Sequence, residues 1–394
     1  MNPSKTPSVR FRGYEDEWEV RKLTDVTYSY SGLTYSPTDV QDKGTFVLRS
    51  SNVKNDQLID ADNVYVNPDI VNSNNVKVGD VIVVVRNGSR SLIGKHAIVT
   101  KEMPHTVIGA FMSAFRGENG DYINALLSTN NFQKEVHKSL GATINQITGK
   151  DFSMMNFLTP KLEEQNKIGS FFKQLDNTIA LHQRKLDLLN EQKKGFLQKM
   201  FPKNGEKIPE IRFAGFNDDW EERKLSDIAN KAVDNRGKTP TISEDGNHPL
   251  LEVASLGNGA PDYSKVTKYL SDETFMAELR AYIREGDILF STVGSIGLVS
   301  LMDTNENAAI AQNIVAFRAN EKYDSKFLYA MLSTKDNQHK AQRIVMGAVQ
   351  PSIKVSQLVD VDYCVTENME EQRKLGEYFL NLDNLITLHQ RELF

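Results

Sequence analysis

The sequence has little of what several classes of protein require. Its single cysteine, Cys364, excludes an intramolecular disulfide and a thiolate metal cluster. Its seven histidines are scattered, which argues against a zinc site. The N-terminal residues form no apolar segment before a small-residue cleavage site, so we expect no signal peptide. Apolar runs such as Val81–Val85 are far too short to cross a membrane. These absences predict a cytoplasmic protein.

The sequence also lacks the basic excess that small DNA-binding domains usually have. Lys and Arg number 47 against 52 Asp and Glu, which gives a formal net charge of −5. Any surface that faces a nucleic acid must therefore be local, with the acidic excess placed elsewhere. The 394 residues are enough for two or three hydrophobic cores, because domains usually have ~100–200 residues.

The motifs of common catalytic sites are missing as well. The stretch from Gly88 to Lys95 has one residue too many for a phosphate-binding loop. Gly257 and Gly259 are not followed by the third glycine of a dinucleotide-binding turn. The sequence has no His-Glu-x-x-His motif and no Asn-Pro-Pro-aromatic motif of an amino-methyltransferase. We therefore predict that the chain is not an enzyme.

What the sequence does have is an internal duplication. Residues 10–25 and 212–227, RFRGYEDEWEVRKLTD and RFAGFNDDWEERKLSD, are identical at ten of 16 positions. Residues 163–186 and 370–393, EEQNKIGSFFKQLDNTIALHQRKL and EEQRKLGEYFLNLDNLITLHQREL, are identical at 15 of 24. Self-similarity at a nearly fixed offset indicates repeated structural units. We predict two copies of one unit, each a globular domain followed by a helix.

The middles of the two repeats differ although their ends match closely. Residues 28–77 and 230–284 have almost nothing in common. Two repeats with similar ends and different central segments indicate that both units perform the same function on two different binding targets. Drift after the duplication is the alternative explanation.

The repeated helical segments carry a heptad pattern. Apolar or weakly apolar residues recur every three or four positions from Ile168 to Met200 and again from Leu375 to Leu393. A sustained 3.5-residue period requires a partner helix, and the natural partner of each helix is the other copy. The residues expected to pair the helices or to dock partner proteins are Ile168, Phe172, Leu175, Ile179, His182, Leu186, Leu375, Phe379, Leu382, Ile386, His389 and Leu393.

His182 and His389 occupy equivalent positions in this pattern. One interpretation is a metal site or a pH switch, and the other is a polar residue that fixes the register of the helices. We favour the second, because no cluster of carboxylates and histidines accompanies them in sequence, and we predict no bound metal. The first helix is expected to run from about Glu163 to Met200, ~55 Å at ~1.5 Å per residue.

The fold class predicted for each globular unit is α+β. Strands are expected at residues 81–86, 97–100, 287–291, 298–302 and 314–318, and short helices at 122–128 and 326–333. The two helical segments are expected to pair with each other as a coiled coil. The predicted boundaries are 1–160 for the first domain, 161–203 for the central helix, 204–365 for the second domain and 366–394 for the C-terminal helix.

Loops that follow the predicted central strands are rich in small polar and basic residues. Arg pairs with guanine edges, Asn and Gln pair with adenine, and Ser, Thr and Lys contact phosphates. Such residues on loops over a rigid frame are typical of recognition surfaces, although polar loops also occur simply because they are soluble. The candidate DNA-binding residues are Arg86, Asn87, Ser89, Arg90, Lys95, Arg236, Lys238, Thr239, Ser291, Thr292, Ser295, Gln312, Asn313, Gln350 and Ser352.

Several of these features form one pattern across essentially the whole chain. They are the W-E-x-R-K-L-x-D openings (Trp18–Asp25 and Trp220–Asp227), the stretches Gly286–Gly297, Ala311–Asn313 and Gly347–Ile353, and the repeated helical segments. Together they resemble the specificity subunits of type I restriction–modification systems. The first repeat departs from this pattern at residues 86–94 and 141–145.

The resemblance implies a function and a set of partners. Each globular unit would be a target recognition domain that reads one half of a split site in double-stranded DNA. The two helices would pair as an antiparallel coiled coil with pseudo-twofold symmetry and act as a ruler. Two methylation subunits would dock on the helices and bring S-adenosylmethionine, so that this chain itself binds no cofactor. Two restriction subunits are further expected partners.

Two other functions are open to a chain with these features. One is a scaffold whose coiled coil joins other proteins and whose domains bind peptides or glycans. The other is a self-sufficient nuclease, against which the absence of a repeated carboxylate cluster argues.

Overall fold

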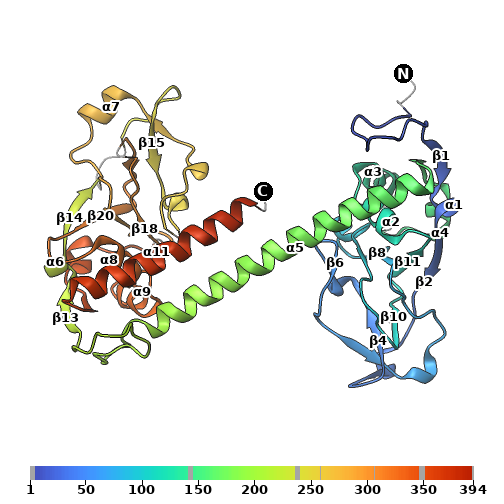
Figure 1. Cartoon of the computed structure of the whole chain (residues 1–394), viewed down its shortest axis with the longest axis horizontal. Coiled ribbons are helices and arrows are strands. Elements are labelled where there is room, and N and C mark those ends of the chain that lie inside the picture. Colours follow the sequence, from blue (N-terminus) through green and yellow to red (C-terminus); the bar gives the residue numbers. More distant parts are fainter. Residues whose placement is uncertain are drawn as a thin grey trace. The chain divides into compact units, whose positions relative to one another are not determined.

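The structure, a computed structural model, describes residues 5–140, 145–235, 240–257, 259–305, 307–345 and 351–392. Its contacts divide the chain into unit 1, residues 1–179, and unit 2, residues 180–394. The boundary lies inside the longest helix, α5 (Leu162–Lys199), whose first part belongs to unit 1 and whose second part belongs to unit 2 (Figure 1).

The frame of unit 1 is an antiparallel sheet with strand order β2-β11-β8-β9. Every residue of the central strand β8 is buried, because both faces of the sheet are covered. Side chains alternate across a strand, so Val81 and Val83 pack with the helices while Ile82 and Val84 pack toward a second sheet. The elements are β2 (Tyr28–Ser31), β8 (Val81–Val84), β9 (His96–Ile98), β11 (Met112–Arg116), α2 (Gly120–Leu127), α3 (Asn130–Ser139) and α4 (Gly149–Met154).

The second sheet of unit 1 is built mainly from the part of the chain that differs between the repeats. It has the order β10-β4-β7-β3, in which only β10 and β4 are parallel. A separate hairpin, β5–β6, follows β4 in the chain. A two-stranded ribbon, β1–β12, and the short helix α1 complete the unit. The elements are β1 (Glu19–Lys22), α1 (Leu23–Val26), β3 (Val40–Gln41), β4 (Thr45–Leu48), β5 (Val53–Lys54), β6 (Gln57–Leu58), β7 (Val64–Val66), β10 (Thr106–Ile108) and β12 (Asn156–Thr159).

Unit 2 repeats the same frame. Its main sheet has the order β14-β20-β17-β18, which corresponds strand by strand to the frame of unit 1, and its ribbon pairs β13 with β21. The sheet from its differing middle has three strands, β16-β15-β19, where unit 1 has four. The elements are β13 (Glu221–Lys224), α6 (Leu225–Ile228), β14 (Ala229–Asp234), β15 (His248–Leu251), β16 (Tyr269–Leu270), α7 (Asp272–Ala277), β17 (Ile288–Ser291), β18 (Val299–Leu301), β19 (Ala309–Ile310), β20 (Ile314–Ala319), α8 (Ser325–Leu332), α9 (Lys335–Gln342), α10 (Val355–Leu358), β21 (Asp362–Val365) and α11 (Met369–Glu392).

The helix pair lies within unit 2. There α11 packs against the part of α5 that begins at Ala180 (Figure 1). The Nδ1 atoms of His182 and His389 are 3.4 Å apart, and the ring centroids of Phe196 and Tyr378 are 5.6 Å apart. Contacts that advance along α5 go backward along α11, so the two helices are antiparallel, as predicted.

The predicted strands and short helices are confirmed, and so is the α+β class. In both units the glycine-aspartate pair before the central strand makes the same ion pair. Asp80 accepts two hydrogen bonds from Arg116, at 2.7 Å each, and Asp287 accepts two from Arg318, at 2.7 and 2.8 Å. The buried carboxylates thus fix the central strand to its neighbour in each sheet.

A second ion pair joins the start of each long helix to the segment that opens the same repeat. Arg10 donates to both carboxylate oxygens of Glu164 at 2.7 Å, and Arg212 donates to both of Glu371 at 2.6 and 3.0 Å. The Glu164 side chain is 2% exposed and that of Glu371 is 1% exposed. Each glutamate lies in the first turn of its helix, where the helix dipole also favours a negative charge.

This geometry predicts that unit 2 depends on Glu371. The Glu371→Ala variant should lower the free energy of unfolding by about 3–5 kcal/mol, because it leaves Arg212 without its buried partner. Urea denaturation followed by circular dichroism measures the difference. The neighbouring Glu370→Ala variant is the matched control, since Glu370 is exposed and pairs with Lys374 on the helix surface. Equal effects of the two variants would contradict the assignment.

Candidate nucleic-acid interface and helix pair

In unit 1 the loop after β8 folds against the segment that begins at residue 145. Arg86 and Gln146 form an antiparallel backbone bridge. The Arg90 Nε atom donates to Asn145 Oδ1 at 2.8 Å, and Asn145 Nδ2 donates to the Gly88 carbonyl at 3.1 Å. Two chain segments far apart in sequence thus build one polar surface at the end of the main sheet.

The candidate residues of unit 1 gather on or beside this surface. Arg86 is exposed, and its guanidinium lies over the ring of Phe111 at 5.0 Å from the centroid. Asn87 is half-buried, because it donates to Ser50 Oγ at 3.2 Å and accepts from the Ser89 amide at 3.0 Å. Ser89, Arg90 and Lys95 are exposed. This set can present both guanidinium and hydroxyl donors to a nucleic acid.

Unit 2 builds the equivalent loop with the same pairing. Val293 bridges Ser352, and the Gly294 amide donates to the Pro351 carbonyl at 3.2 Å. Gly294 has a φ of +77°, a conformation that glycine adopts without strain. Both repeats have a Gly-Ala pair in sequence, Gly141-Ala142 and Gly347-Ala348. The loop after the central strand therefore meets the segment that follows this pair in both units, although the residues differ.

Two candidates in unit 2 require a correction. Ser291 and Thr292 are 0% exposed. The Ser291 hydroxyl donates to the Ser295 carbonyl at 2.6 Å and accepts from the Leu298 amide at 2.8 Å. The side-chain oxygens of these two residues form hydrogen bonds with backbone groups in the interior. We therefore correct the prediction that Ser291 and Thr292 contact DNA directly.

The other candidates of unit 2 differ in how accessible they are. Ser295 and Gln312 are exposed, and Asn313 and Ser352 are half-buried. Arg236, Lys238, Thr239 and Gln350 lie outside the described residues. For the accessible residues in both units, contact with DNA stays a prediction.

Sequence reasoning missed three residues at this surface: Ser50, Phe111 and Asn145. Asn145 and Phe111 directly position two predicted arginines. The similarity between Gly141-Ala142 and Gly347-Ala348 was the signal for Asn145, because it marked the same segment in both repeats. No comparable signal marks Phe111, which follows from the pairing of β8 with β11.

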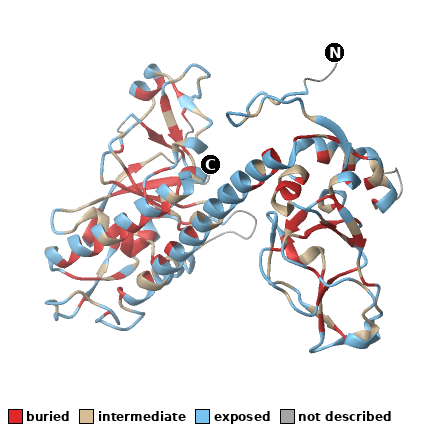
Figure 2. Ribbon diagram, turned by 45° about the vertical axis from the view of Figure 1, so that its right-hand side comes forward, coloured by how far each residue is buried: buried red, intermediate tan, exposed pale blue. Residues whose placement is uncertain are grey.

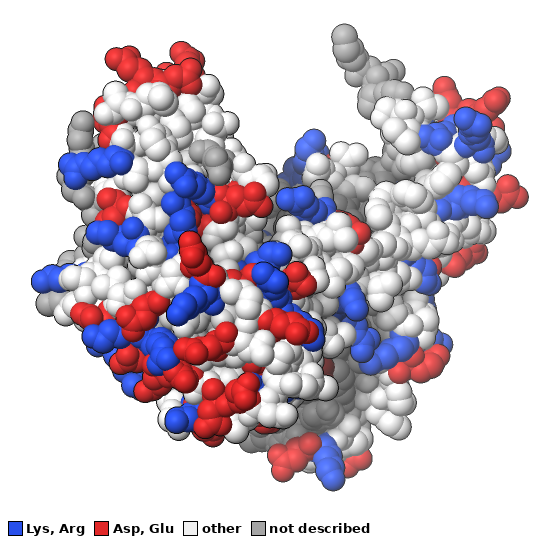
Figure 3. Space-filling model, turned by 60° about the vertical axis from the view of Figure 1, so that its left-hand side comes forward, with Lys and Arg blue, Asp and Glu red and all other residues white. Residues whose placement is uncertain are grey.

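Charge on the molecule is mixed rather than separated. On the face drawn in Figure 3, Lys and Arg side chains alternate with Asp and Glu and form no large area of one sign. Some of the arginines are committed to internal ion pairs, as Arg10 and Arg212 are. A nucleic-acid surface on this chain must therefore depend on a few placed groups more than on bulk charge.

The predicted seam residues fall into two groups. Those in unit 2 are buried, with exposures of 9% for Leu186, 2% for Leu375, 0% for Phe379, 8% for Leu382 and 0% for Ile386. In unit 1, Ile168 is half-buried, and Phe172, Leu175 and Ile179 are exposed. Leu393 lies outside the described residues. Among the described residues, the apolar positions of this pattern are thus buried against the partner helix only within unit 2.

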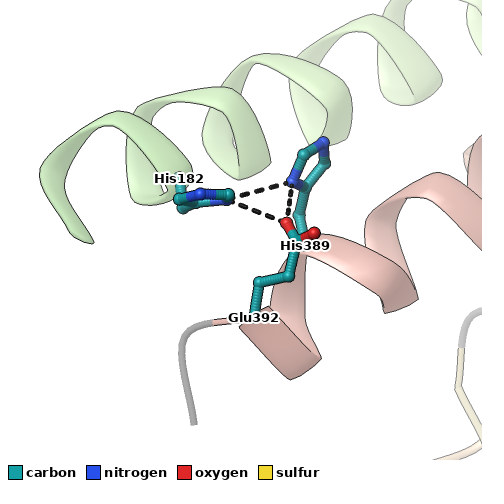
Figure 4. Close-up of side chains that lie close together, drawn as sticks. All are labelled: His182, His389 and Glu392. Carbon is teal, nitrogen blue, oxygen red and sulfur yellow. Dashed lines mark hydrogen bonds and ion pairs between the residues drawn. The ribbon is translucent and has the colours of Figure 1, made fainter. Parts of the chain in front are cut away.

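His182 and His389 meet in the seam together with Glu392 (Figure 4). Glu392 Oε2 is 2.9 Å from the Nδ1 atom of each histidine. These two distances are hydrogen-bond distances, shorter than the ~3.3 Å that separates neighbouring ligand atoms around a tetrahedral zinc with bonds of ~2.0–2.1 Å to nitrogen. The 3.4 Å between the two Nδ1 atoms matches that spacing, so one of the three distances in the cluster fits a metal ion. Among the described residues, neither Nε2 atom has the second partner that metal-bound histidines usually have. The geometry favours a polar contact that fixes register.

In the part of the chain that the structure describes, no helix combines the length and the apolar character needed to cross a membrane.

Comparison with known proteins gives two matches to one family model. The model of the type I restriction modification DNA specificity domain matches residues 15–191 and 217–393. The MjaVIII specificity subunit of Methanocaldococcus jannaschii is 25% identical over 261 residues, which cover 64% of this chain and 61% of that protein. The EcoKI specificity subunit of Escherichia coli strain K12 is 24% identical over 301 residues, which cover 72% of this chain and 63% of that protein. This chain thus spans less than two thirds of these two relatives.

A similar fold has been solved. The S subunit of a type I restriction-modification system from M. genitalium aligns with a TM-score of 0.67 at 15% sequence identity. The alignment covers 98% of this chain and 95% of that chain. At this identity the comparison establishes a shared fold.

The histidine cluster gives a direct prediction about metal. Zinc at a modest molar excess should leave the melting temperature of the chain unchanged, because the three groups satisfy one another by hydrogen bonds. Differential scanning calorimetry with and without zinc is the measurement, and His182→Ala serves as the control that lacks one ligand. A zinc-dependent rise in melting temperature that His182→Ala removes would establish a metal site instead.

Proposed function

Because the chain belongs to the family of the type I restriction modification DNA specificity domain, we propose that it is the sequence-specific DNA-recognition subunit of a type I restriction–modification complex. It reads a bipartite site in double-stranded DNA and directs partner adenine methyltransferase and restriction subunits to that site. The observation that carries the proposal is one frame repeated twice, with a different sheet inserted in each copy.

The repeated frame supports the reading of two half-sites. The loop after the central strand, which starts at Arg86 in unit 1 and at Thr292 in unit 2, is held by the same kind of backbone bridge in both units. A rigid frame that holds variable loops is the usual arrangement of recognition sites. Equivalent surfaces with different side chains would recognise different bases.

The helices support a role in spacing and in assembly. Helix α5 is continuous over 38 residues, which corresponds to ~57 Å at ~1.5 Å per residue, against ~34–36 Å for one turn of DNA. We propose that this length sets the spacing of the half-sites. Two methyltransferase subunits would dock along the helices, and two restriction subunits would join them.

The proposal assigns the chemistry to the partners. S-adenosylmethionine would bind the methyltransferase subunits, which would also flip the target adenine out of the duplex. This chain would supply sequence recognition without a cofactor, in the cytoplasm.

Co-expression tests the proposal as a whole. The chain, together with a candidate methyltransferase subunit, should produce adenine methylation at one split motif with a fixed spacer, mapped across a host genome. Replacing residues 28–160 by the equivalent domain of another family member should change one half of the motif and leave the other. An unchanged motif after the exchange would refute the role of the first domain, and a complex without methylation would favour the scaffold.

A single loop residue tests the interface. If Arg86 contacts a base, Arg86→Ala should weaken binding to the cognate site by about 1–3 kcal/mol and relax specificity at one position. Fluorescence anisotropy at several salt concentrations measures both effects. Arg21→Ala removes the same charge from β1, where Glu19 holds the guanidinium at 2.7 Å, so it should leave specificity intact. Equal losses of binding affinity for the two variants would mean that Arg86 contributes only a sequence-independent attraction to phosphates.

A further inference from the structure

Three chain segments meet side by side at one end of the main sheet of unit 1. The backbone amides of Val85 and Arg86 both donate to the Phe111 carbonyl, at 2.9 and 3.2 Å. On the other side, Arg86 and Gln146 form an antiparallel bridge. Next to that bridge, the Ile147 amide donates to the Val85 carbonyl at 2.9 Å. Phe111, Arg86 and Gln146 therefore form a row across three segments, which we call the end row of unit 1.

Unit 2 has an equivalent row with the same backbone pattern. The Thr292 amide donates to the Asn313 carbonyl at 2.8 Å, and the Ile353 amide donates to the Thr292 carbonyl at 2.9 Å. Val293 and Ser352 form the antiparallel bridge. The end row of unit 2 is thus Asn313, Val293 and Ser352, at the places where unit 1 has a phenylalanine, an arginine and a glutamine.

The side chains of the end row of unit 1 point away from the helical side of the sheet. The neighbours Val85 and Ile147 are 5% and 1% exposed and pack in the core that contains residues of α2 and α3. Side chains alternate between the two faces of a strand, so Arg86 and Gln146 point the other way. Arg86 is exposed and Gln146 is half-buried. The strands β8 and β11 that lead to the row are mostly buried (Figure 2), so the row marks where their chain becomes accessible.

Both end rows are attached to the segment that differs between the repeats. In unit 1 the Gly109 amide, two residues before the row, donates to the Leu48 carbonyl at 2.8 Å. In unit 2 the Ala311 amide, also two residues before the row, donates to the Leu251 carbonyl at 2.9 Å. Leu48 and Leu251 belong to strands of the differing middles. The rows are therefore fixed parts of the frame that lie beside the variable sheets.

The end rows carry polar groups that remain available for a ligand. Gln146 and Asn313 are half-buried, and among the described residues neither side-chain amide makes a hydrogen bond. The Arg86 guanidinium lies 5.0 Å from the Phe111 ring centroid, so one face of the guanidinium is covered and its N–H edge stays accessible. A side-chain amide matches the N6 and N7 atoms of adenine, and a guanidinium edge matches O6 and N7 of guanine.

The width of an end row fits a short stretch of duplex DNA. Neighbouring strands lie ~4.8 Å apart, so three segments span roughly 10 Å. Successive bases of B-DNA are ~3.4 Å apart along the helix axis. Side chains from the three segments can therefore reach bases within about three base-pair steps.

We propose that the end rows are the elements that select bases in the two units. In unit 1 Arg86 reads a guanine, and Gln146 reads an adenine within about three base pairs of it. Phe111 is a positioning residue that holds the guanidinium in plane. In unit 2 the arginine is replaced by Val293, and Asn313 reads an adenine from the neighbouring segment. This inference rests on the proposed function and adds which positions of the repeated frame determine specificity.

Selection from randomised double-stranded DNA by the full chain, followed by sequencing of the bound molecules, tests the end rows. With Gln146→Ala, the enrichment of adenine at one position of the first half-site should fall about fivefold or more. Gln146→Met should give the same loss, because it keeps the length of the side chain and removes its amide. Neither variant should change the second half-site. Asn313→Ala should have the opposite pattern, with a loss at one position of the second half-site alone.

The positioning role of Phe111 has its own readout. Phe111→Leu should lower the enrichment of guanine at the position that Arg86 reads by about two- to fivefold, because the guanidinium loses its aromatic face. Phe111→Trp should preserve that enrichment, which a purely structural role of the phenylalanine ring does not predict. Asn131→Ala removes an exposed amide from the surface of α3 and is the matched control, with no change expected in either half-site.

The outcomes separate this inference from the proposed function. If the unchanged chain enriches no DNA motif, the proposed function fails and the inference fails with it. If the unchanged chain enriches a split motif and the Gln146 and Asn313 variants keep it, the inference alone is overturned. Uniform loss of DNA binding by both Gln146 variants, at unchanged melting temperature, would also overturn it, because base reading predicts a change at a single position.

Discussion

The rest of each unit depends on the buried ion pair between an N-terminal arginine and the first turn of the long helix. The bidentate Arg–carboxylate geometry fixes both the position and the direction of the helix start, which a lysine at Arg10 or Arg212 would not do. In unit 1 the Trp18 Nε1 atom also donates to Glu164, at 3.1 Å. Since the carboxylate is almost fully buried, the free-energy cost of removing its charge from water is offset only when the arginine is in place. The helix therefore leaves its domain in a direction set by residues outside the variable middle.

This arrangement separates stability from recognition. The ion pairs Asp80–Arg116 and Asp287–Arg318 hold the main sheets, and the glycines Gly169 and Gly376 allow the close helix contacts. None of these residues lies between 28 and 77 or between 230 and 284. The middles can consequently supply three strands to the second sheet of unit 1 and two strands to that of unit 2 without altering the frame. A protein that must read two different half-sites from one geometry requires this freedom.

The sequence predicted the frame well because its signals are local or repeated. Short apolar segments bounded by clusters of Gly, Asn, Ser and Asp located β8 and β17, and the heptad pattern located α5 and α11. The solvent accessibility of individual side chains was harder to predict, because it depends on which residues distant in the sequence pack against them. Ser291 and Thr292 lie in a polar stretch that suggests a surface, yet the turn places their hydroxyls inside. Phe111 stacks on Arg86 through the pairing of two strands, and no sequence pattern connects them.

The contact between Lys193 and Asp383 shows why a heptad pattern alone does not fix a helix pair. Leucine and phenylalanine tolerate a shift of register, since one apolar contact replaces another. A buried aspartate does not, because a shift of one heptad would take Lys193 away from Asp383 and leave both charges unpaired. The contact between His182 and His389 adds a second polar constraint. The register of the pair in unit 2 is therefore set by its polar residues, and its affinity by its apolar ones.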